Sequence, residues 1–150
     1  MSSKFKRVKA NGGVEALKKR VKASGTVDSG IIDAGEHPSG DATVAQIGFW
    51  NEFGTTRIPE RSFMRSTIKD KKKDIVALQK GLLKKIVKGD MEVETGLGLV
   101  GEKMSDFIRQ KIVDISSPPN TPFTISKKGS SNPLIDTGQL KNSIIYEVNR

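Results

Sequence analysis

Two short motifs in this sequence have the spacing of catalytic or cofactor-binding signatures. The first, Gly96–Gly101 (GLGLVG), matches the G-x-G-x-x-G pattern in which a helix N-terminus faces a pyrophosphate. That chemistry needs a strand before the glycines, but a long helical pattern precedes them and no βαβ unit surrounds them. We therefore predict that these glycines allow close packing of a helix against its neighbours, and that no nucleotide cofactor binds.

The second motif, Asp136-Thr137-Gly138, is the active-site triplet of aspartic proteases, in which two carboxylates share one proton. A symmetric dimer could supply the second carboxylate. However, only 12 residues follow Gly138, too few for the rest of a protease barrel. We predict instead a turn in which the Asp136 carboxylate caps the local backbone.

The sequence has few residues of the types that other catalytic or metal sites need. The chain has no cysteine, which excludes disulfides, thiol catalysis and cysteine-ligated metal. His37 is the only histidine, so a catalytic triad or a transition-metal site lacks residues. The sequence predicts no catalytic residue, no cofactor and no metal, and hence a protein that is not an enzyme.

Several short elements are predicted in the first third of the chain. A helix is expected where Val14 and Leu17 form an apolar stripe, and a breaker-poor apolar segment that ends before Gly54 favours a second helix. Between them we expect a strand and an exposed loop. The predicted ranges are Gly13–Ala23 (helix), Thr26–Ala34 (strand), Glu36–Asp41 (loop) and Ala42–Phe53 (apolar helix).

Two long helices dominate the rest. Apolar residues recur at helical spacing in Ser62–Lys88, with Ser62 as the expected cap, and again in Val93–Ile115. The short Gly89-Asp90 turn between them predicts antiparallel packing. Ser116–Asn132 is predicted to be irregular, followed by a helical turn in Asp136–Asn142 and a strand in Ser143–Val148.

These elements predict one α+β domain over residues 1–150. We expect a small, mostly antiparallel sheet packed against the two long antiparallel helices.

Basic residues cluster in this chain, whose net charge is +9. One cluster has eight basic residues within the first 22 positions, four of them in the N-terminal arm, residues 1–12, and another comprises Lys69 and 71–73. Such charge favours nucleic acid or an acidic protein surface, although a solvated face is the alternative. The arm residues expected to make this contact are Lys4, Lys6, Arg7 and Lys9. No apolar run is long enough to span a membrane and no secretory signal is present, so we expect synthesis in the cytoplasm.

The segment Phe49–Arg65 has the composition of a protein–protein contact. It places three aromatic residues within five positions and mixes them with arginines and acids. We expect some rings to lie in the core and the charged residues to lie at the rim. The candidate interface residues are Phe49, Trp50, Asn51, Glu52, Arg57, Glu60, Arg61 and Arg65.

Asn51–Thr55 followed by Ile58–Arg65 resembles a signature of small tailed-bacteriophage proteins: the virion-morphogenesis, neck and tail-completion proteins. The usual form ends in Pro-Arg-Pro-Phe, where this chain has Glu-Arg-Ser-Phe. A second stretch, from Pro119 to Ile144, is similar to the ending of the same family. Together the resemblance covers most of residues 27–148 and includes the Asp-Thr-Gly triplet.

The resemblance implies a structural subunit of the phage head–tail junction with a neck-protein-like or tail-terminator-like α+β fold and no cofactor. Such proteins form homo-oligomeric rings, here a hexamer or a dodecamer, between the connector or neck proteins and the tail tube. Packaged double-stranded DNA passes through the lumen, and the protein belongs to the virion. A tail-terminator ring subunit and a basic DNA-binding accessory protein are the alternatives. Residues 116–132 would dock on a neighbouring ring through Pro119, Asn120, Pro122, Lys127 and Lys128.

Overall fold

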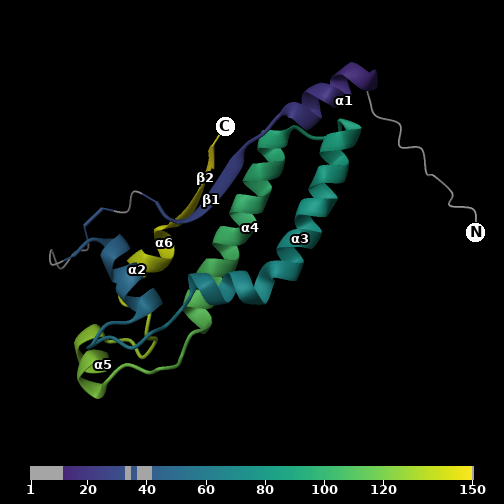
Figure 1. Ribbon diagram of the computed structural model, residues 1–150. Coiled ribbons are helices and arrows are strands. Elements are labelled where there is room, and N and C mark those ends of the chain that lie inside the picture. Colours follow the sequence, from purple (N-terminus) through teal and green to yellow (C-terminus); the bar gives the residue numbers. More distant parts are fainter. Residues whose placement is uncertain (1–11, 33–34, 37–41, 150) are drawn as a thin grey trace, which may run out of the picture.

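The computed structural model describes residues 12–32, 35–36 and 42–149, and the basic-arm residues Lys4, Lys6, Arg7 and Lys9 lie outside this part of the chain. Within these residues six helices and two strands follow one another in the order α1, β1, α2, α3, α4, α5, α6 and β2 (Figure 1). Their bounds are α1 Gly13–Lys22, β1 Thr26–Ile31, α2 Val44–Phe53, α3 Met64–Lys88, α4 Val93–Asp114, α5 Pro122–Lys128, α6 Gln139–Asn142 and β2 Ile144–Asn149.

The two strands form one antiparallel sheet. Its register pairs Thr26 with Asn149 and Ile31 with Ile144, so β1 lies against the last strand of the chain. The sheet packs on α4, while α3 packs on α4 and α1 (Figure 1). The α+β class and the antiparallel pairing are therefore confirmed, but only one of the two long helices carries the sheet.

The glycines of the GLGLVG motif lie inside α4, at its contacts with neighbouring elements. A Cβ on Gly101 would lie 2.6 Å from both Tyr146 Cδ2 and Val27 Cγ2. A Cβ on Gly96 would lie 2.9 Å from Ile86 Cδ1 on α3. The expected close packing of this helix at small residues is confirmed.

The two long helices form an antiparallel hairpin. Gly89 follows α3 in a left-handed conformation with φ 86°, which glycine adopts without steric cost, and its N–H donates to the carbonyls of Lys85 and Ile86. In Figure 1, α3 first runs across the base of α4 and then turns to run alongside it. The turn predicted at Gly89-Asp90 is confirmed.

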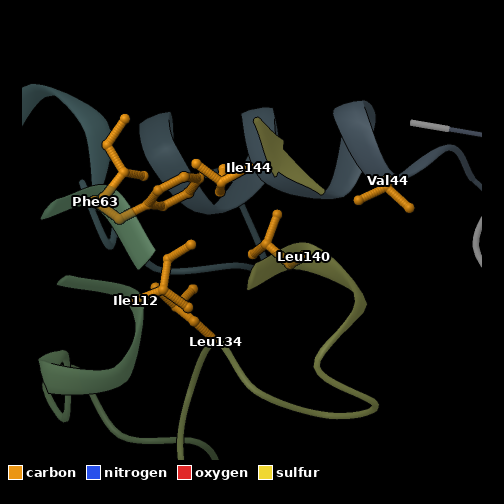
Figure 2. Packing of buried hydrophobic residues seen from close by; sticks show 7 residues of the cluster. Val44, Phe63, Ile112, Leu134, Leu140 and Ile144 are labelled. Atoms are coloured by element: carbon orange, nitrogen blue, oxygen red, sulfur yellow. The ribbon is translucent and has the colours of Figure 1, made fainter. Parts of the chain in front are cut away.

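The buried core lies where α2, α4, α6 and β2 meet. Phe63, Ile112 and Ile144 are fully buried there, and Leu134 and Leu140 complete the contact from the segment before β2 (Figure 2). Residues far apart in sequence therefore make one small core.

Three sequence predictions need correction. Residues 122–128 form α5 rather than irregular chain, because Thr121 caps the helix and Gly129 ends it with φ 70°. Ser62 is not the N-cap of α3. Phe63 occupies the N-cap position, and its side chain makes no capping hydrogen bond. The first strand ends at Ile31, three residues before the predicted end, and the last two predicted positions lie outside the described residues.

Candidate assembly surface

The side chain of Glu52, at the end of α2, is buried and holds the start of α3. Its carboxylate accepts hydrogen bonds from the backbone N–H groups of Phe63 at 2.7 Å, Met64 at 2.8 Å and Arg65 at 2.9 Å. N–H groups at a helix start have no partner inside the helix, and they favour a negative charge. Glu52 thus caps the N-terminus of α3, although it lies 11 positions before Phe63 in the sequence.

Ser62 supports this cap from the donor side. Its hydroxyl donates to Glu52 Oε1 at 2.8 Å, so Ser62 contacts the cap rather than forming it. Burial raises the pKa of Glu52, but hydrogen bonds from the N–H groups of Arg65 and Met64 and from Ser62 outweigh it. The pKa of Glu52 therefore lies below its ordinary value. The carboxylate is ionised at neutral pH and belongs to the fold.

Arg65 is held in one orientation by this carboxylate. Its Nε donates to Glu52 Oε1 at 3.1 Å, and its Nη2 donates to the Glu52 carbonyl at 2.7 Å and to Glu60 Oε1 at 2.8 Å. The guanidinium lies 4.4 Å from the ring centroid of Phe53, a cation–π distance. One face of this arginine is therefore fixed while the side chain stays half-exposed.

Two aromatic rings extend this arrangement over the surface. The rings of Phe49 and Phe53 lie 4.7 Å apart, and the two residues are 60% and 49% exposed. We call Phe49, Phe53 and Arg65 the aromatic patch. Large apolar side chains beside an arginine that is already ordered are typical of residues that dominate a protein–protein contact.

Arg61 joins the two sequence motifs that are far apart in the chain. Its buried guanidinium donates from Nε to the Pro118 carbonyl at 2.8 Å, and from Nη2 to the Pro119 carbonyl and Asn120 Oδ1 at 3.2 Å each. Its Nη1 is 3.4 Å from Asn51 Oδ1. The segment after α4 is thereby held against the end of α2.

The expectation that the charged residues of Phe49–Arg65 lie at a rim is wrong for two of them. Glu52 is 4% exposed and Arg61 is 6% exposed, because each satisfies backbone groups inside the chain. The expectation that some of the aromatic side chains lie in the core is confirmed, since Phe63 is buried while Phe49 and Phe53 are exposed. Of the remaining candidates, Trp50 and Asn51 are half-buried, whereas Arg57 and Glu60 are exposed.

The predicted docking residues divide into exposed and tethered ones. Pro119, Pro122 and Lys127 are exposed. Lys128 is half-buried, and its ammonium donates to the carbonyls of Asn132 and Pro133 at 3.3 Å each. Burial lowers the pKa of Lys128, and the Asp136 carboxylate acts in the opposite direction. Asn120, held by Arg61, and Lys128 therefore fix the two ends of α5.

The Asp136-Thr137-Gly138 triplet lies in a turn, but Asp136 does not cap it. Among the described residues the acceptors are Thr137 Oγ1 for the Gln139 N–H and Asn132 Oδ1 for the N–H groups of Leu134 and Ile135. Nor do the described residues include a group of three or more acids and histidines placed to hold a metal.

A second apolar surface lies between the two long helices near α1. It is a groove of about 370 Å³ between elements that include α3 and α4, and Leu83 at its side is 58% exposed. Other lining residues are Val27, Leu82, Ile86, Leu97 and Val100.

Within the described residues, no helix is long and apolar enough to cross a membrane.

Comparison with protein-family models, with curated proteins and with solved structures finds no match for this chain.

The contacts that build this site were partly accessible from sequence. The Thr121-Pro122 pair and Gly129 are the usual signals of a short helix, and they could have indicated α5, which was predicted as irregular chain. The capping role of Glu52 and the bonds of Arg61 had no local signal, because their partners are brought together only by the fold.

Proposed function

We propose that this protein is a structural subunit of a phage head–tail junction that assembles into a homo-oligomeric ring through its aromatic patch. The ring would join the connector side to the tail and surround the DNA channel, as a neck, tail-completion or tail-terminator component. The phage context rests on the sequence resemblance, and the mode of association rests on the geometry of the patch.

The observation that carries the proposal is the exposure of Phe49 and Phe53 next to a fixed Arg65. Adjacent exposed aromatics bury large apolar area when a partner covers them. Because Glu52 and Glu60 already hold the Arg65 side chain, less side-chain entropy is lost when the patch is covered. A surface that is already ordered in this way favours association with a partner.

The contacts of Arg61 provide a second support. The two segments that carry the resemblance, Asn51–Arg65 and Pro119–Ile144, are separate in sequence but meet at this side chain. A shared signature in two distant segments is expected when both build one structural unit. In that unit α2, which carries Phe49 and Phe53, lies on the same part of the molecule as α5 (Figure 1).

The small size of the sheet and the surface that it leaves uncovered are a third support. A sheet of two strands is marginal on its own, and in the part of the chain that the structure describes no other strand of the sheet pairs with β1 or β2. Exposed strand edges and the groove beside Leu83 leave apolar and hydrogen-bonding surface uncovered. Neighbouring subunits in a ring would cover such surface, because a head-to-tail contact that closes uses two different faces of each copy.

The proposal is tested by sedimentation and negative-stain imaging of the full chain. We expect the wild type to form closed rings and the Phe49→Ala/Phe53→Ala variant to remain monomeric. Both phenylalanine side chains are exposed, so the variant should keep the circular dichroism spectrum of the wild type. Its thermal midpoint should match that of the wild type at a protein concentration too low for assembly, because association raises the apparent stability.

Val14→Ala is the matched control, because Val14 is 69% exposed on α1, away from the patch (Figure 1). It should assemble as the wild type does. A wild type that stays monomeric at its highest soluble concentration, or a patch variant that still forms rings, would contradict the proposal.

A further inference from the structure

One face of α3 carries a row of lysines opposite the face that packs on α4. Lys69, Lys73, Lys80 and Lys84 are spaced by four, seven and four positions, so each lies on the same side of the helix as the next one along it. The opposite side carries Thr67 and Leu82, which are buried. We call these four residues the lysine ridge; all four are exposed.

The ridge concentrates positive charge that forms no ion pair, although Lys111 and, more weakly, Lys69 lower the pKa of Asp70. The two acids of α3 are engaged elsewhere: Asp70 pairs with Lys111 at 2.8 Å, and Asp74 lies 3.9 Å from Lys71. No ridge lysine forms an ion pair with any other described residue. Like charges at i, i+4 repel one another, so the arrangement is unfavourable for the helix alone.

The composition of the ridge distinguishes between two kinds of acidic partner. Protein–protein interfaces are depleted in lysine and enriched in aromatics and arginine, and the ridge has neither of the latter. Between Lys73 and Lys84 the same side carries Val76 and Ala77, both exposed, and no acid. Flexible ammonium groups with no acid between them suit a phosphate backbone, which presents about one negative charge per 1.7 Å of duplex axis.

We propose that the lysine ridge of α3 binds the phosphate backbone of double-stranded DNA without regard to sequence. Only the source of the duplex rests on the proposed function: in an assembled ring it would be the DNA in the lumen. It assigns the contact to α3 rather than to the N-terminal arm. Binding by the free chain is measurable whether or not rings form.

The test uses fluorescence anisotropy of a labelled mixed-sequence duplex titrated with the full chain at several salt concentrations. The ridge variant is Lys73→Gln/Lys80→Gln/Lys84→Gln. Two controls carry the same charge change elsewhere: Lys103→Gln/Lys127→Gln/Lys141→Gln on α4, α5 and α6, and Lys4→Gln/Lys6→Gln/Lys9→Gln in the arm.

We expect the ridge variant to lose at least about tenfold in affinity, and its salt slope to fall by about 2 to 3, since each lost phosphate contact removes about 0.9. Both controls should bind within about threefold of the wild type, because binding that depends on particular contacts is less sensitive to net charge. Sedimentation of the ridge variant should still show rings, which separates a failure of this inference from a failure of ring assembly.

Three results would overturn the inference. The first is an equal loss in all three variants, which would mean that net charge alone attracts DNA. The second is a loss confined to the arm variant. The third is displacement of the duplex by polyglutamate at equal charge concentration, which would point to an acidic protein surface instead.

Discussion

Glu52 and Arg61 show how single charged residues organise this chain. Both are buried, and both bind backbone groups of segments that come later in the sequence. Their residue types indicated only that the segment is charged. Which groups they satisfy depends on the fold, so sequence periodicity could not predict their roles.

Glu52→Gln should lower the stability at pH 7 by about 2 kcal/mol, because hydrogen bonds to a charged group are stronger than those to an amide. The folded pKa of Glu52 lies below its ordinary value, so this contribution is present above the unfolded pKa of about 4.3 and is lost as the pH falls through the folded pKa. Urea unfolding at pH 7 and near pH 3 should show the gap between wild type and variant narrowing in acid.

Glu60→Gln is the control for this series. Glu60 is exposed, and a surface pair with Arg65 contributes at most about 1 kcal/mol. A Glu52→Gln gap that is constant or grows in acid would show that the charge of Glu52 does not stabilise the start of α3.

Arg61→Ala should lower the free energy of unfolding by about 2 to 4 kcal/mol, since it leaves the Pro118 and Pro119 carbonyls without their donor. Arg61→Lys should not restore it, because one ammonium cannot reproduce a guanidinium fork. Hydrogen exchange should rise in residues 120–124, next to the released carbonyls, in both variants. Unchanged exchange, or an equal effect of Arg57→Ala at an exposed position, would refute this role.

At the scale of elements, the glycines of α4 were predicted correctly from context. Their surroundings lacked the strand that nucleotide binding needs, and the contacts with Val27, Tyr146 and Ile86 confirm packing. Helix periodicity also predicted both long helices, because each has a continuous apolar stripe. The short α5 was missed although its cap and its Gly129 are visible in the sequence, since the prolines around it suggest irregular chain.

Two alanine substitutions in α4 should have opposite effects. Gly101→Ala places a Cβ 2.6 Å from Tyr146 and Val27 and should cost about 1 to 3 kcal/mol through overpacking. Gly98→Ala meets nothing closer than 3.8 Å and should gain up to about 1 kcal/mol from helix propensity. Thermal unfolding of the pair decides this, and equal shifts would contradict tight helix–sheet packing at Gly101.

At the scale of the whole molecule, the antiparallel hairpin and the α+β class followed from the sequence, whereas the placement of the sheet on only one of the two long helices, α4, did not. Strand pairing between Thr26–Ile31 and Ile144–Asn149 joins elements separated by most of the chain, which local patterns do not specify. The resulting fold leaves the aromatic patch, the groove and the lysine ridge on its surface. Three uncovered surfaces among the described residues fit the proposed role of a subunit in an assembly.

The proposed function implies that a tailed phage encodes this chain, and its most direct test is a cryo-electron microscopy map of that tailed particle. We expect a closed ring of this protein between the connector and the tail tube, with Phe49 and Phe53 buried at the contact between adjacent copies. The map would also give the copy number and distinguish a neck ring from a tail-terminator ring. A particle that lacks the chain, or a ring in which both phenylalanines face solvent, would contradict the account.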